Sequence, residues 1–260
     1  MIKLALRKIG NLFLIPFVVS AFSACEMFKI DNYEAPNATL KGGIIDDVTG
    51  QLVETDLQNG STLRFKELGD EWAEGGILSR VVMQNGEYQD KLMFAGRYSV
   101  DFIDCNFYPF FVPEIVIKKG DNTHDFRVKP YIRVRNVNIR QEGNQIVATF
   151  NLQAGDPEVR LNNVRIFLST DIYVGDAFTY FPLSGDGHTI AFSPAAVINE
   201  NEEYRLTIDL THENNKPYFK YKKNYYFRVG AMAAIASGGT SVGTIRRNYA
   251  PFTVLNFNVP

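Results

Sequence analysis

From residue 39 onward the sequence consists of short runs rich in Val, Ile, Phe and Tyr, separated by Gly, Asn, Asp and Pro. β-Branched and aromatic residues favour extended strands and the separating residues favour turns, so this pattern is typical of strands joined by tight connections. No stretch keeps the 3.6-residue hydrophobic period of an amphipathic helix, and residues 67–74 can form at most one short helix. The chain is therefore predicted to be all-β.

The predicted strands fall into two sets. They cover residues 39–45, 63–65, 97–102, 114–117 and 124–128 in the first set and residues 132–139, 145–152, 164–168, 204–210, 225–231 and 252–257 in the second. Pro130 lies between the sets and removes a backbone donor there. Strands at this spacing favour two β-sandwiches in tandem, covering residues 38–130 and 131–260.

The N-terminus has the composition of an export signal. Lys3, Arg7 and Lys8 precede an apolar stretch at 9–22, and small residues lead up to Cys25. The stretch is short and contains Pro16, which argues against a membrane-spanning helix. Its end resembles a bacterial lipobox, which implies a signal peptide at 1–24, a lipid on Cys25 and a short tether at 25–37; an ordinary secretory signal is the alternative.

The charge balance limits the kinds of molecule that the chain can bind, and the cysteine content limits its disulfide bonds. The chain has 27 basic and 29 acidic side chains, and three of the basic ones lie in the signal, so the remainder is acidic. This balance argues against a nucleic-acid partner. Cys25 and Cys105 are the two cysteines. If Cys25 carries lipid, Cys105 has no partner in the chain, and its apolar surroundings predict a small buried hydrophobe rather than a reactive thiol.

Each predicted sandwich resembles a known fold. Residues 41–53, 85–88 and 95–100 of the first half are similar to carboxypeptidase-regulatory or transthyretin-like domains. Asp46 and Asp47 are interpreted there as turn residues rather than metal ligands, because no acidic residues follow at calcium-loop spacing. Residues 225–231 and 237–241 of the second half resemble a late strand and hairpin of an immunoglobulin or fibronectin type III domain, with Tyr225, Phe227 and Val229 on one face.

Signal, tether, two such domains and the stretch 246–249 (Arg-Arg-Asn-Tyr) together resemble one family. These are outer-membrane lipoproteins of unknown function in Bacteroidota that accompany Sus-type nutrient importers. The resemblance implies a lipid-anchored protein at the outer membrane, exposed at the cell surface. It also implies a TonB-dependent barrel and its lidding lipoprotein as partners, and an oligosaccharide or peptide as ligand.

The sequence contains no recognisable catalytic pattern. His124, His188 and His212 lie in separate segments without a second metal-type ligand close by, and there is no Gly-x-Ser-x-Gly elbow. The glycine-rich stretch 237–241 lacks the lysine of a phosphate loop. We therefore predict no metal, no cofactor and no enzymatic activity; a hydrolase built from scattered carboxylates is the alternative, as is a purely structural partner of the importer.

Aromatic residues in turn-rich segments are the candidate ligand contacts. Trp72, Phe178 and Tyr180 are predicted to stack on a sugar ring, with neighbouring polar groups accepting its hydroxyls. The alternative is that they close the ends of the sandwiches. A further cluster at 107–111 has consecutive aromatics that must point to both faces of an extended segment, so at least half are expected to be core.

Overall fold

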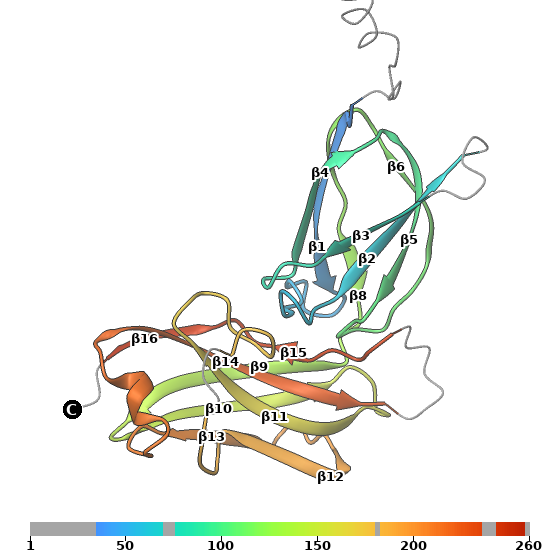
Figure 1. Ribbon diagram of the computed structural model, residues 1–260. Coiled ribbons are helices and arrows are strands. Elements are labelled where there is room, and N and C mark those ends of the chain that lie inside the picture. The colour runs from blue at the N-terminus through green and yellow to red at the C-terminus, as the bar shows by residue number, and fades with distance from the viewer. Residues whose placement is uncertain (1–34, 70–75, 180–182, 236–242, 258–260) are drawn as a thin grey trace, which may run out of the picture. The chain divides into compact units, whose positions relative to one another are not determined.

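The computed structural model describes residues 35–69, 76–179, 183–235 and 243–257. Residues from Pro36 onward form one compact unit that is all-β, as predicted (Figure 1). Its helical content in the described ranges is the short 3₁₀ helix η1 (Lys216–Phe219), and no helix there is long and apolar enough to cross a membrane. Cys25, Trp72, Tyr180 and the stretch 237–241 lie outside the described residues.

The first sandwich is built from two sheets. One has the order β4-β1-β7, with β8 also pairing β1, and the other has the order β3-β2-β5-β6. Their strands are β1 (Ala38–Asp46), β2 (Thr62–Leu68), β3 (Ile77–Val81), β4 (Glu87–Met93), β5 (Gly96–Ile103), β6 (Val112–Ile117), β7 (Gly120–Thr123) and β8 (Phe126–Val128). Apolar side chains from both sheets form one core, in which the Phe102 ring meets Phe126 edge-on at 5.1 Å.

The second sandwich has a three-stranded sheet, β13-β10-β9, facing a sheet in which β14 is flanked by β11 and by β15 and β16, with β12 beyond β11. Its strands are β9 (Ile132–Glu142), β10 (Gln145–Ala154), β11 (Arg160–Ser169), β12 (Thr189–Val197), β13 (Glu203–Asp209), β14 (Lys223–Ala234), β15 (Asn248–Tyr249) and β16 (Thr253–Phe257). Tyr225, Phe227 and Val229 are fully buried on one face of β14, which confirms the predicted alternation.

Several sequence predictions need correction at the level of elements. Of the predicted strand 124–128, residues 126–128 form β8, while His124 and Asp125 connect it to β7, a strand that the sequence did not predict. β1 pairs both in parallel, through different residues. Glu67 and Leu68, which begin the segment 67–74 where the sequence allowed at most one short helix, belong to β2. Cys105 is a buried member of the first core, as expected, and burial raises the pKa of its thiol well above the usual value.

Candidate functional site

The contact between the two sandwiches, here called the joint, is organised by one buried arginine. Arg228 projects from the face of β14 opposite the core and is completely inaccessible to solvent. Its Nη1 donates to the carbonyl oxygens of Thr55 at 2.8 Å and Val174 at 3.1 Å, and its Nε donates to that of Ala250 at 2.8 Å. Its Nη2 donates to Glu54 Oε2 at 2.5 Å and to the Gln84 carbonyl at 3.2 Å. Arg228 thus joins four backbone segments to one carboxylate.

Burial dominates the electrostatics around this arginine. It lowers the pKa of Arg228, although the nearby Glu54 carboxylate acts in the opposite direction. It also raises the pKa of Glu54, and the attraction of Arg228 offsets only part of that rise. The Tyr249 ring covers the guanidinium at 4.2 Å from its Cζ, a cation–π geometry. A buried charge of this kind is retained only when its donors are satisfied, and here they are.

The stretch 246–249 supplies the second layer of the joint. Arg247 pairs with Asp176 at 2.8 Å, and the Tyr249 hydroxyl donates to the same carboxylate at 3.0 Å. Asn248 donates to the Asn106 carbonyl of the first sandwich at 2.8 Å. The motif that marked the family resemblance in the sequence therefore consists of joint residues.

A third layer joins the start of β9 to the end of β1. Arg133 and Asp46 form a bidentate ion pair with distances of 2.6 and 2.7 Å, and both side chains are buried. Burial alone would raise the pKa of Asp46, but hydrogen bonds from Arg133, the Val48 amide and the Thr49 hydroxyl prevail and lower it to about 2. Asp46 is therefore both a turn residue and an ion-pair partner across the joint.

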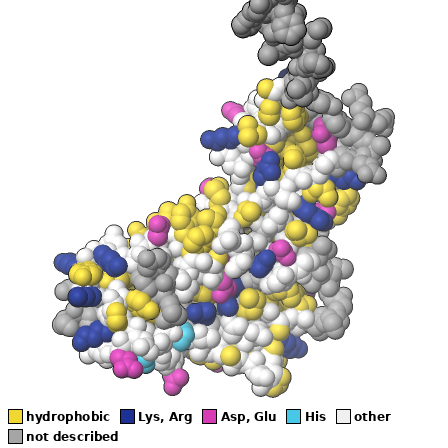
Figure 2. Space-filling model, in the orientation of Figure 1, with side chains coloured by type: hydrophobic (Ala, Val, Ile, Leu, Met, Phe, Trp, Pro, Cys, Tyr) yellow, Lys and Arg dark blue, Asp and Glu magenta, His cyan; other side chains and the backbone are white. Residues whose placement is uncertain are grey.

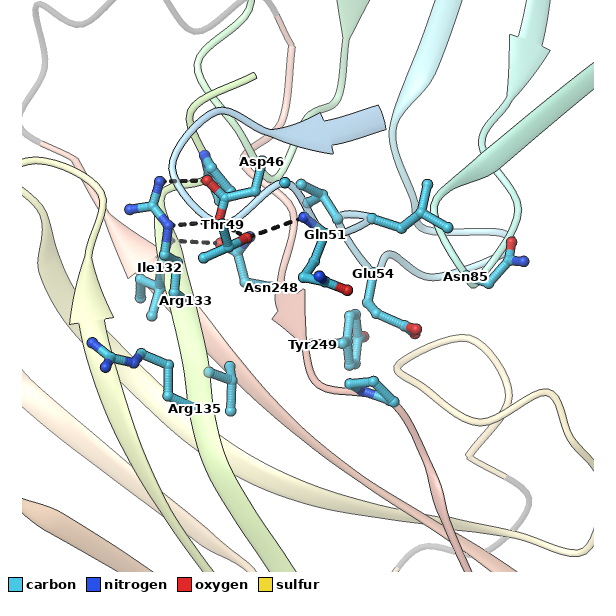
Figure 3. A pocket seen from close by; sticks show the side chains of 16 residues that line it. Asp46, Thr49, Gln51, Glu54, Asn85, Ile132, Arg133, Arg135, Asn248 and Tyr249 are labelled. Atoms are coloured by element: carbon cyan, nitrogen blue, oxygen red, sulfur yellow. Dashed lines mark hydrogen bonds and ion pairs between the residues drawn. The ribbon is translucent and has the colours of Figure 1, made fainter. Parts of the chain in front are cut away.

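A cavity of about 540 Å³ opens at this joint (Figure 3). Its lining comes from four segments: the β1 turn and the residues after it, Asn85 in the turn before β4, the start of β9, and the residues around β15. Its polar side chains include Gln51, Glu54, Arg135 and Tyr249, and apolar walls are provided by Val53, Ile132, Val134 and Pro251.

Several polar groups of this cavity have hydrogen-bonding capacity left. Glu54 uses Oε2 for Arg228, whereas its Oε1 makes no hydrogen bond in the described part of the chain. Within the same residues the side-chain amide of Gln51 has no partner, and Arg135 makes one loose ion pair, 3.7 Å from Glu200. In Figure 3 Gln51 and Glu54 lie beside Tyr249, so donor and acceptor groups gather around one aromatic edge.

The predicted aromatic contacts are not part of this cavity. Phe178 is 37% exposed on the loop after β11, with its ring 6.0 Å from that of Tyr173. The neighbouring Tyr226 ring, on β14, meets the exposed Phe252 edge-on at 5.4 Å. Hydrophobic side chains gather on this face of the molecule in Figure 2. We call the exposed residues Ile172, Tyr173, Phe178 and Phe252 the aromatic patch.

Sequence reasoning missed the joint cavity residues. Gln51 lies in the segment 41–53, which was singled out only for its fold resemblance, and Arg135 lies in a predicted strand, so neither residue had a signal for ligand contact. Across the described ranges, no three His, Cys, Asp or Glu side chains are grouped to hold a metal ion.

Comparison with known proteins places the chain in a family. Residues 132–236 match the domain of unknown function DUF3823_C. No curated protein matches the chain. A proposed carbohydrate-binding protein from Bacteroides uniformis, known from its crystal structure, is 40% identical over 85% of this chain and 100% of its own, with a TM-score of 0.77.

More distant structures share the fold. A DUF3823 family protein from Parabacteroides merdae is 21% identical over 86% of this chain and 100% of its own, with a TM-score of 0.66. One from Bacteroides ovatus is also 21% identical, over 84% of this chain and 98% of its own, with a TM-score of 0.64. With the Bacteroides uniformis protein matched over its whole length, the chain belongs to its family, a Bacteroidota family of unknown function marked here by the DUF3823_C domain.

Proposed function

We propose that this protein is a non-catalytic carbohydrate-binding lipoprotein that serves a Sus-type, TonB-dependent nutrient importer at the bacterial surface. The observation that carries the binding role is the joint cavity, where Glu54, Gln51 and Arg135 keep unused hydrogen-bonding groups beside apolar walls. The relative that is 40% identical is itself described as a proposed carbohydrate-binding protein.

The chemistry of the cavity suits a neutral sugar. Its volume of about 540 Å³ lies within the usual range for small-ligand pockets. A sugar hydroxyl both donates and accepts, so it can donate to Glu54 Oε1 while accepting from the Gln51 amide or the Arg135 guanidinium. The buried Asp46 and the partly buried Glu54 are both paired with arginines, and Arg135 lies 3.7 Å from Glu200, so each charged side chain named here has a partner of opposite charge and the cavity is not built to select an ionic ligand.

Calorimetry against a panel of neutral oligosaccharides and short peptides tests this binding role. We expect Gln51→Ala and Arg135→Ala each to weaken binding of the preferred sugar by about ten-fold, the effect of about one lost hydrogen bond. Gln145→Ala, at an exposed position on β10 outside the cavity, is the matched control and should bind as the wild type does. The proposal fails if the wild type binds no sugar, or if both cavity variants bind normally.

The aromatic patch supports a second candidate role, docking on the importer. Its four residues are between 37% and 46% exposed, and apolar groups clustered in this way commonly mark interaction surfaces. Co-purification with the TonB-dependent barrel should be lost in a Tyr173→Ala and Phe178→Ala double variant and kept in Gln51→Ala. Trp72→Ala and Tyr180→Ala, tested for sugar binding, would decide whether these two predicted contacts serve a ligand.

Membrane attachment is proposed to depend on the lipid at Cys25. The Cys25→Ser variant should move from the membrane to the soluble fraction, because it has no thiol to accept an acyl-bearing group. Cys105→Ala is the control, since Cys105 is buried in the first core and should not affect attachment. A Cys25→Ser protein that stays in the membrane fraction would refute the anchor.

A further inference from the structure

A second polar depression lies on the first sandwich, on the outer face of the β3-β2-β5-β6 sheet. Strand alternation buries Leu63 and Phe65 of β2 in the core and turns Arg64 and Lys66 outward. The strand register places Arg64 opposite Asp101 and Lys66 opposite Ser99 of β5. These four side chains form the floor of a depression of about 360 Å³, which we call the sheet-face trough.

The trough has apolar walls on both sides of this polar floor. Phe111 and Pro113 line it together with Leu68 and Ile77. β6 pairs β5 and β3 pairs β2, so Pro113 and Ile77 lie on opposite sides of the floor. Phe111 is 63% exposed, whereas Phe107, at the other end of the same aromatic run, is fully buried. At least half of the aromatics in the run 107–111 were expected to be core: Phe107 is buried and Tyr108 is partly buried against the second core, whereas Phe110 and Phe111 are exposed.

The floor keeps both donors and acceptors free. Arg64 holds Asp101 through Nε and Nη2, at 2.5 and 2.7 Å, which leaves its Nη1 uncommitted. Neither the Lys66 ammonium nor the Ser99 hydroxyl has a partner among the described residues. Arg64 and Asp101 cancel in charge, so the described lining has a surplus of one positive charge, carried by Lys66.

We propose that the sheet-face trough binds an acidic sugar unit, such as a uronic acid within a polysaccharide. The carboxylate of the sugar pairs with Lys66 and Arg64 Nη1, its hydroxyls bond to Ser99 and Asp101, and its C–H face lies on Phe111. A polyphosphate ligand fits less well because the Asp101 carboxylate is part of the floor and would repel it. The choice of a sugar rests on the proposed function, but the trough shares no lining residue with the joint cavity.

Calorimetry with a galacturonic acid trisaccharide and with the neutral galactose trisaccharide tests the proposal. The wild type should bind the acidic sugar, and Lys66→Met should weaken that binding by about ten-fold or more, because a charge-assisted contact is lost. Phe111→Ala should also weaken it. Lys91→Met, at an exposed lysine of β4 in the other sheet, is the matched control and should bind normally. Lys66 and Phe111 are both exposed, so unchanged thermal unfolding will show that these variants are folded.

Gln51→Ala separates this site from the joint cavity. It should leave binding of the acidic sugar unchanged. The inference is overturned if the wild type does not bind the acidic trisaccharide, or if Lys66→Met binds it as well as the wild type. Loss of that binding in Gln51→Ala but not in Lys66→Met would assign the acidic sugar to the joint cavity, which would refute the trough and leave the proposed function in place.

Discussion

Arg228 shows how far a residue's role can depart from its local sequence. Alternation along β14 places it on the face opposite the core, where an arginine is normally solvated. The structure covers that face with the first sandwich and satisfies the guanidinium with carbonyls from both sandwiches. A strand pattern identifies the face of a residue, but it does not reveal what covers that face.

Arg228→Met is expected to destabilise the protein by about 3–5 kcal/mol, because it leaves the Glu54 carboxylate, whose side chain is only 16% exposed, without its partner. Urea denaturation gives the free energy of unfolding. Arg205→Met is the matched control: its ion pair with Glu142 is exposed, so it should cost less than about 1 kcal/mol. Equal losses in the two variants would contradict the role assigned to Arg228.

Asp46 makes the stability of the protein depend on pH at the acid end. Its pKa is about 2 in the folded protein, below the usual 3.8, so the unfolded chain takes up its proton first as the pH falls. The stabilisation of about 2 kcal/mol is therefore complete above about pH 5 and lost as the pH falls towards 2. Asp46→Asn should be less stable than the wild type at pH 7, and the gap should narrow at pH 2.5. A constant gap would show that Asp46 does not titrate in this way.

At the scale of elements, the predictable strands are those with clear apolar alternation. β10 and β14 were predicted from their Val, Ile, Phe and Tyr content. β3, β4, β7, β12 and the two-residue β15 were missed. β4 buries Tyr88, Asp90 and Met93 among polar residues, and β12 contains Pro194 and three alanines, which weaken the strand signal. The positions of these missed strands depend on pairing with neighbouring strands, and local composition does not predict that pairing.

Gly42 in β1 lies so close to its neighbours that no larger residue fits there without moving a strand. A Cβ added there would lie 1.8 Å from the His124 carbonyl oxygen and 2.9 Å from the Tyr88 hydroxyl. Gly42→Ala should therefore separate β1 from the segment between β7 and β8 and cost more than about 2 kcal/mol. Gly76→Ala is the control, because nothing lies within 4 Å of its added Cβ. Similar thermal unfolding temperatures for the two variants would contradict this packing.

At the scale of the whole molecule, the candidate site could not be predicted from the sequence. The joint cavity combines residues near positions 50, 133 and 249, and nothing in the sequence predicts that these segments meet. The two sandwich cores could be predicted from the sequence, because each follows from strand alternation within its own half. The joint depends on buried polar pairs, and single polar residues leave no periodic signal.

The joint predicts that residues 36–260 unfold in one transition. Asn106 and Asn248 are both buried at the joint, and Asn248 also accepts a hydrogen bond from the Ile132 amide at 3.1 Å. Scanning calorimetry of the wild type should show calorimetric and van't Hoff enthalpies that agree. In Asn248→Ala the transition should broaden or split as the sandwiches uncouple. Two separate transitions in the wild type would contradict a tight joint.

The polar character of the joint also limits how such a protein can diversify. An apolar contact between modules tolerates many partners, whereas the Arg228 cluster needs carbonyls and a carboxylate at fixed positions on the opposite sandwich. A chimera that joins one half of this chain to the other half of a distant relative would bury unmatched charges. The two halves must therefore be inherited together. Outward-facing positions such as Lys66 and Gln51 can change without disturbing the joint, so substitutions there can alter which ligand is bound.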